Sequence, residues 1–262
     1  MLLQLLDPGR NTPPEFQSVY VSLIKLCKKI SQALYVIPAQ TTRKVQLYHV
    51  NSAIQDLQTW LEQLPPHLRC SSHIYPSHRR AVYTLHLRYW KAMIHVTRPF
   101  LVFTVARPSG LANEAKRKKY DELSFACQDA AGAAVDILRS MSEERLLSSL
   151  LPFDINCILE LLQVFLLVKY KGNPNACAEQ MECCMQVCRS MPSVGWTKRT
   201  MPEITALMNE AETISRGARG SGNGEKERPS WTQPSLQNSV FADAGLVAQP
   251  STTEMNGVPD VL

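Results

Sequence analysis

The chain has 262 residues, of which 45% are hydrophobic and 19% charged, with 28 basic against 23 acidic side chains. This much apolar content in a chain of this length can bury a substantial core, and it excludes wholesale disorder. Eight cysteines are too few for a disulfide-stapled miniprotein, and 11 glycines disfavour a β-sandwich or a glycine-looped α/β enzyme. The composition therefore predicts an all-α fold.

The net charge of +5 is spread unevenly along the chain. Before Gly217 there are 25 basic and 18 acidic residues, whereas 3 basic and 5 acidic residues follow it. An excess of seven positive charges, scattered through the body, is too weak for a nucleic-acid footprint. We therefore expect no direct DNA contact from this chain.

Apolar residues at helical spacing divide the chain into elements. They predict a bundle of about six to seven helices, over 15–37, 47–64, 77–103, 121–141, 150–170, 176–191 and 202–214. The segment 77–103 is apolar over most of its circumference, so we expect it at the centre of the domain. Pro99 should kink or end that helix near Thr97.

The most apolar stretch of the chain runs from Leu146 to Tyr170. Because it contains Pro152, Asp154 and Glu160, it favours a buried helix over a membrane span, and we expect no membrane partner.

The composition also predicts the domain organisation. Residues 1–14 are expected to be an irregular N-terminal segment, and residues 15–215 a helical domain. Gly, Ser, Pro, Gln, Asn and Thr dominate residues 216–262, so this segment is expected to be a disordered tail.

Motifs for catalysis and cofactors are missing from the sequence. The glycine cluster at 217–224 lacks both the P-loop Lys-Ser/Thr and the GxGxxG spacing, and no HExxH occurs. Cys177, Cys184 and Cys188 lie on one predicted helix face without a second segment to complete a tetrahedral zinc site. We read them as a core-facing stripe. The sequence predicts no enzyme, no cofactor and no metal site.

A positive stripe follows the predicted central helix. Its members step by four, four, three, four and three residues: Arg80, Thr84, Arg88, Lys91, His95 and Arg98. One interpretation is that the stripe is the solvent-facing edge of the helix. The other is that Arg88, Lys91, His95 and Arg98 line a groove for an unidentified small anionic effector or an acidic partner segment, to which arginine offers bidentate pairing.

A second basic run, Lys116, Arg117, Lys118 and Lys119, falls between predicted helices. It is interpreted as lying in a loop, either as a nuclear import signal or as an ordinary solvated loop.

Four short motifs occur in a recognisable order. Residues 57–65 read L-x-x-W-x-x-x-L-P, residues 85–89 read L-H-L-x-Y, and residues 98–101 read R-P-F-L. Residues 127–131 then read C-x-x-A-A. In this order, over residues 15–211, they resemble the C-terminal part of the regulatory middle homology domain of fungal zinc binuclear cluster transcription factors. Residues 146–154 are similar to the branch related to the proline-utilisation trans-activator.

The resemblance implies a nuclear regulatory domain that acts through protein interaction, with other transcription proteins or a second copy as partners. The six-cysteine zinc cluster of that family has no counterpart, since no C-x-x-C occurs. The resemblance also implies that the first half of the middle domain is missing, so that the helical domain is incomplete. The alternative is an all-helical scaffold or adaptor unrelated to transcription.

Overall fold

The computed structural model describes residues 12–36, 47–70, 74–106, 114–147, 152–170 and 177–190, with isolated positions between 202 and 209. These residues form an all-α bundle and contain no strand. The predicted fold class is therefore confirmed. The tail expected at 216–262 and most of the N-terminal segment expected at 1–14 lie outside the described residues.

The α-helices whose bounds the structure gives are, in chain order, α1 (Phe16–Ser31), α3 (Leu47–Glu62), α4 (Arg79–Ala106), α5 (Glu114–Glu143), α6 (Pro152–Tyr170) and α7 (Ala178–Ser190). A π-helical turn, η1 (Gln32–Val36), continues α1, and two 3₁₀ turns, η2 (Pro66–Leu68) and η3 (Pro76–His78), connect α3 to α4. The pair Pro65-Pro66 closes α3 as expected, because proline has no amide hydrogen to extend the helix.

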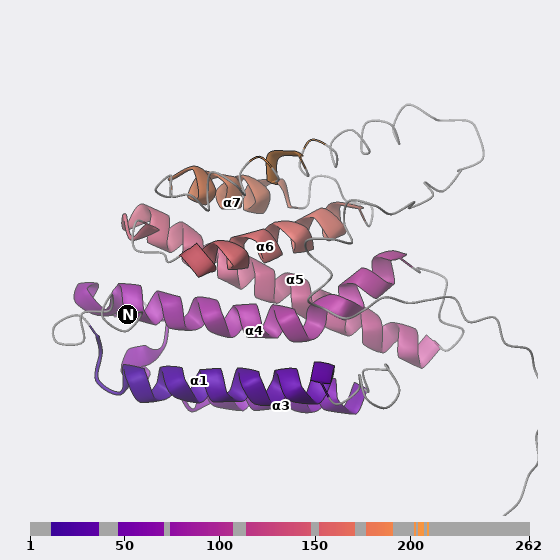
Figure 1. Cartoon of the computed structure of the whole chain (residues 1–262), viewed down its shortest axis with the longest axis horizontal. Coiled ribbons are helices and arrows are strands. Elements are labelled where there is room, and N and C mark those ends of the chain that lie inside the picture. The colour runs from indigo at the N-terminus through magenta and orange to yellow at the C-terminus, as the bar shows by residue number, and fades with distance from the viewer. Residues whose placement is uncertain are drawn as a thin grey trace, which may run out of the picture.

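The central helix of the bundle is α4. It contacts α1 and α3 on one side and α5 and α6 on the other, and α7 packs on α5 and α6 (Figure 1). Val82, Leu85 and Leu101 of α4 are completely buried. The prediction that the segment apolar around its circumference lies at the centre is thus confirmed.

The most extensive helix contact joins α4 to α5. Small residues on α5, including Cys127, Ala131 and Ala134, are fully buried. The ring of Phe100 meets that of Tyr120 edge-on, with centroids 5.1 Å apart. Small side chains let two helix backbones approach closely, and the aromatic pair fills the wider part of the interface.

Pro99 does not end α4, which continues to Ala106. The turns of α4 after Pro99 bend away from the axis of its earlier turns (Figure 1). This bend agrees with the kink predicted at Pro99. Because Pro99 has no N–H, the carbonyl of His95 loses its helical donor. The Tyr35 hydroxyl of η1 donates to this carbonyl instead, at 2.8 Å.

Helix α5 begins at Glu114, seven residues before the predicted start at 121. It therefore includes Lys116, Arg117, Lys118 and Lys119, and their assignment to a loop was wrong. The reason is helix propensity, because Glu, Ala, Lys and Arg are all good helix formers. The prediction missed the first two turns of α5 because these residues show no apolar residues at helical spacing.

Candidate functional site

The predicted positive stripe of α4 is neither exposed nor fully buried. All six members, Arg80, Thr84, Arg88, Lys91, His95 and Arg98, are half-buried. The stripe is thus not a freely solvated edge. It divides between two neighbours of α4, with Arg88 facing α1 and with Lys91, His95 and Arg98 near α6 and η1.

Two contacts join the stripe to α6. The Lys91 ammonium lies 3.4 Å from Glu160 Oε1, and Arg98 Nη1 donates to Gln163 Oε1 at 3.1 Å. Lys91 and Arg98 are seven residues, or two turns, apart on α4, and their partners Glu160 and Gln163 are about one turn apart on α6. The two contacts together fix the position of α6 along the axis of α4. We call this group, with His95 and Tyr35, the polar seam.

His95 lies at the middle of the polar seam. Its ring centroid is 4.8 Å from that of Tyr35, at an interplanar angle of 49°. Burial lowers the pKa of His95, and the nearby cations Arg98 and Lys91 lower it further, against the opposing effect of the Glu160 carboxylate. Burial also raises the pKa of Tyr35 to about 12, which keeps its hydroxyl a donor to the His95 carbonyl.

Arg88 stands apart from the polar seam. Its guanidinium carbon lies 5.5 Å from the ring centroid of Tyr20 on α1, a cation–π arrangement. At the other end of the stripe, the Thr84 hydroxyl donates to the Arg80 carbonyl of its own helix, at 2.9 Å. The structure therefore brings together three of the four proposed site residues and separates the fourth.

Sequence reasoning missed the residues that meet the stripe, namely Tyr35, Glu160 and Gln163. One signal was available, because Glu160 is a carboxylate within the most apolar helix of the chain. A charge in such a helix rarely stays unpaired, so it pointed to a cationic partner.

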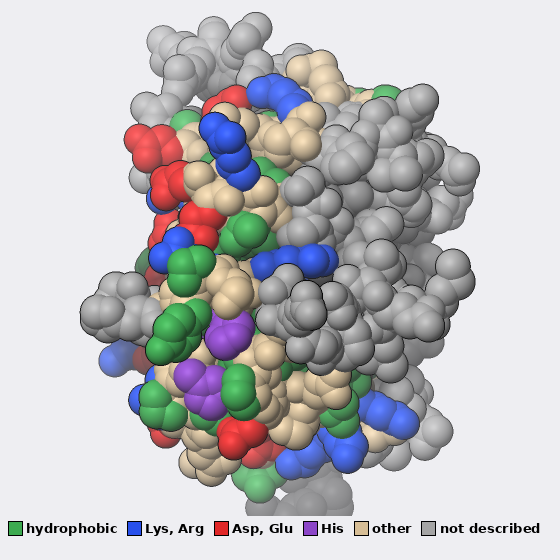
Figure 2. All heavy atoms as spheres, turned by 90° about the vertical axis from the view of Figure 1, so that its left-hand side faces the viewer, with side chains coloured by type: hydrophobic (Ala, Val, Ile, Leu, Met, Phe, Trp, Pro, Cys, Tyr) green, Lys and Arg blue, Asp and Glu red, His purple; other side chains and the backbone are tan. Residues whose placement is uncertain are grey.

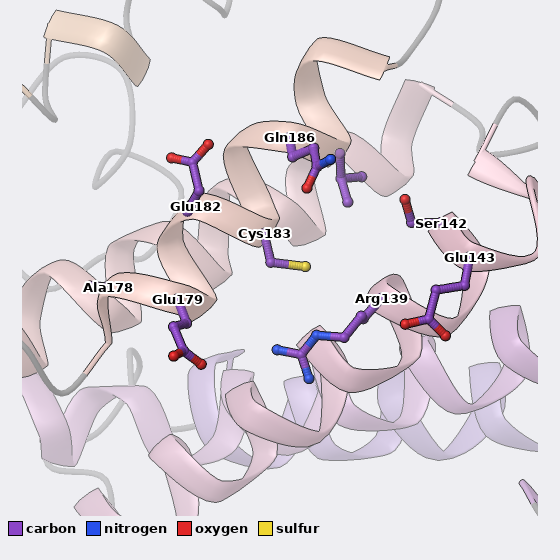
Figure 3. A pocket seen from close by; sticks show the side chains of 9 residues that line it. Arg139, Ser142, Glu143, Ala178, Glu179, Glu182, Cys183 and Gln186 are labelled. Carbon is purple, nitrogen blue, oxygen red and sulfur yellow. The ribbon is translucent and has the colours of Figure 1, made fainter.

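A groove of about 770 Å³ lies between α5 and α7 (Figure 3). Its lining combines charged, polar and small side chains: Arg139, Ser142, Glu143, Ala178, Glu179, Glu182, Cys183, Gln186 and Val187. Figure 3 shows Glu143 and Arg139 on the α5 side and Glu179, Glu182 and Cys183 on the α7 side. Acidic groups thus stand on both walls of the groove.

Cysteines of α7 and of the turn before it pack as expected for a core stripe. Cys177, Cys184 and Cys188 are buried, and Met181 lies among them. Burial raises the pKa of Cys188 to about 11 and also raises the pKa of Cys183 in the groove, the latter against the lowering effect of Arg139. The thiols are therefore protonated near neutral pH and are poor nucleophiles. Within the described part of the chain, no group of three or more His, Cys, Asp or Glu side chains could hold a metal ion.

The residues of the family-like motifs lie in contact with one another. The Trp60 ring stacks on Tyr89 with centroids 5.9 Å apart and planes 15° apart. The Trp60 indole also donates to Ser22 Oγ on α1, at 2.8 Å. A ring nitrogen of His86 lies 2.9 Å from the Leu68 carbonyl after α3. These contacts give the motif residues packing roles between α1, α3 and α4.

Figure 2 shows the end of the bundle that lies on the left in Figure 1. Several Asp and Glu side chains gather along its upper left, with Lys and Arg side chains beside them, and the His side chains lie in the lower half among hydrophobic ones. The basic run lies elsewhere, in the first turns of α5, where Lys116, Arg117 and Lys118 are exposed and Lys119 pairs with Glu122 at 3.2 Å.

A scan against protein-family models, a search of curated proteins and a search of solved structures each returned no match. None of the helices in the described residues is long and apolar enough to cross a membrane.

Proposed function

We propose that this chain is the regulatory portion of a fungal zinc binuclear cluster transcription factor. In this role it works in the nucleus through contacts with other transcription proteins or a second copy. Its own residues perform no catalysis, hold no cofactor and make no direct contact with DNA.

The observation that carries the proposal is the meeting of the motifs in one core. Leu57 and Leu85, from the first two motifs, are completely buried, and Leu64 is almost so. Trp60 and Tyr89 stack on each other, and Phe100 and Cys127 of the later motifs are buried on α4 and α5, the two helices with the most extensive contact. The packing of the four motifs in one core supports the resemblance on which the proposal rests.

Effector sensing is proposed at the polar seam. Arg98 contacts the neutral amide of Gln163, so its positive charge is not matched by a carboxylate at that contact. A small anion could replace the amide and pair with the guanidinium bidentately. Since Arg98 and Gln163 belong to different helices, such a ligand would alter the contact between α4 and α6.

Tethering the chain at a promoter tests the proposal. A fusion to an unrelated DNA-binding domain should change transcription of a reporter relative to that domain alone. The Trp60→Ala variant should lose the effect because it removes the Trp60–Tyr89 stack. The Tyr48→Ala variant, at a side chain that is 74% exposed, is the matched control and should keep it.

A reporter output equal to that of the DNA-binding domain alone, with the fusion protein present at normal level, would contradict the proposal. It would favour the adaptor alternative, for which promoter tethering has no consequence.

A further inference from the structure

The polar seam contains a carboxylate oxygen that has no hydrogen-bond partner. Glu160 Oε1 lies 3.4 Å from the Lys91 ammonium, whereas Glu160 Oε2 is buried and accepts no hydrogen bond in the described chain. A buried acceptor without a donor costs free energy, because it gives up its hydrogen bonds to water without replacement. Such atoms are rare in native proteins, and a bound molecule that supplies the missing donor is one explanation for them.

The charges of the polar seam are also unbalanced. Lys91 and Arg98 contribute two positive charges, and Glu160 contributes one negative charge. His95 adds no charge, because burial and the two cations lower its pKa. Arg98 donates to the neutral amide of Gln163 at 3.1 Å and forms no ion pair with a described residue. The seam therefore has one positive charge in excess, and an anion would balance it.

Both needs are met by an anion that still carries a hydrogen-bond donor. A carboxylate or a sulfate ion at neutral pH has only acceptor oxygens, so it would turn lone pairs toward Glu160 Oε2. Hydrogen phosphate has anionic oxygens, which a guanidinium binds in pairs, and also a P–OH group that donates to a carboxylate oxygen. The combination of a free acceptor and an excess cation thus favours hydrogen phosphate over sulfate.

The two contact points are close enough for one small ion. Glu160 and Gln163 are three residues apart on α6, so they share one side of that helix and lie about 4.5 Å apart along its axis. The Lys91 and Glu160 side chains are 33% and 22% exposed, so this edge of the seam reaches solvent. Because the Oε2 atom itself is buried, the ion can enter only when the Gln163 amide turns away from Arg98.

We propose that the polar seam binds hydrogen phosphate between Arg98 of α4 and Glu160 of α6. The anionic oxygens accept from the Arg98 guanidinium in place of the Gln163 amide, and the P–OH group donates to Glu160 Oε2. The bound ion joins the two helices, which pack side by side (Figure 1). This inference rests on the proposed effector-sensing role of the seam, and it names the chemical class of the effector.

Calorimetric titration of the full chain at pH 8 and constant ionic strength tests the proposal. Inorganic phosphate should bind, and sulfate should bind at least about tenfold more weakly because it has no donor for Glu160 Oε2. Glycerol phosphate should behave like sulfate, because a phosphate monoester has a second pKa of about 6 and has lost its last proton at this pH.

Three variants test the assigned contacts. Arg98→Met should weaken phosphate binding at least about tenfold, because it removes the guanidinium. Gln163→Ala should strengthen phosphate binding, because no amide then has to leave Arg98. Glu160→Gln should abolish the preference for phosphate over sulfate, since a side-chain amide can donate to either ion. Circular dichroism verifies that each variant is folded, and if Arg98→Met does not fold, the change of preference in Glu160→Gln decides.

The matched control is Lys25→Met, which removes one cation from the exposed face of α1 and should leave both affinities unchanged. The proposal is overturned if phosphate does not bind, if phosphate and sulfate bind the original chain equally, or if Arg98→Met binds phosphate as the original chain does. A chain that binds phosphate but has no effect at a promoter keeps the site and loses the regulatory role. A promoter effect without phosphate binding has the opposite meaning.

Discussion

The two sides of α4 are built from different chemistry. Toward α5 it presents mainly buried rings and hydroxyls, with the Thr104 hydroxyl 3.4 Å from that of Ser124. An ion pair, Arg79 with Glu144 at 3.1 Å, lies at the edge of this contact, one residue beyond the end of α5. Toward α6 and η1 it presents the polar seam. Apolar burial supplies most of the free energy of folding, whereas partly buried charges recover little after their desolvation. The α5 side should therefore govern stability, and the seam should govern the register of the helices.

The largest effect is expected on the α5 side of α4. Phe100→Ala leaves a cavity beside Tyr120 and should lower the free energy of unfolding by about 3–5 kcal/mol. Urea denaturation measures it. Phe125→Ala, at a side chain of α5 that is 59% exposed, is the control and should cost far less. Similar costs for the two variants would mean that the contact between α4 and α5 is loosely packed.

The next effect concerns the carbonyl freed by Pro99. Tyr35→Phe removes the hydroxyl that donates to the His95 carbonyl and should cost about 1–3 kcal/mol of stability. In a Pro99→Ala background, the new backbone N–H can donate to that carbonyl, so the same change should cost less. An identical cost in both backgrounds, from denaturant titrations of the four proteins, would show that the hydroxyl acts elsewhere.

A smaller effect is expected from the ion pair of the seam. The Lys91 and Glu160 side chains are 33% and 22% exposed, so solvent screens their attraction in part. Lys91→Met should cost about 1–2 kcal/mol because it leaves Glu160 without that partner. Lys91→Met with Glu160→Met should restore most of the loss. If the double variant loses as much free energy of unfolding as the Lys91→Met and Glu160→Met variants lose in sum, the two side chains do not stabilise each other and this prediction is wrong.

The smallest effect is a pH dependence. The folded chain holds His95 neutral, whereas an unfolded histidine has a pKa of about 6.5. Below that pH the unfolded state binds a proton that the folded state does not, so the free energy of unfolding should fall as the pH falls toward the lowered pKa. His86, also buried with a lowered pKa, acts in the same direction.

His95→Gln should flatten this dependence in part, and His78→Gln, near the surface in η3, is the control variant. Thermal unfolding followed at several pH values measures it. Equal slopes for the original chain and His95→Gln would show that His95 does not contribute.

Sequence reasoning predicted the helices and the central place of α4 because both follow from the spacing of apolar residues. The start of α5 was missed because Lys116–Lys119 interrupts that spacing, although these residues favour a helix. The residues of the stripe were also identified, but their surroundings were not. Which side chain meets Lys91 depends on how α6 is rotated and translated against α4, and no pattern within one helix contains that information.

The position of α4 in the chain order has a consequence for synthesis. On the ribosome, α1 and α3 emerge first, yet α4, on which both pack, has not been made. Their apolar faces stay uncovered until α4 leaves the exit tunnel, and α4 in turn waits for α5. Folding of this chain is therefore a late event during translation, and chaperones that bind exposed apolar segments should engage the first 70 or so residues most strongly.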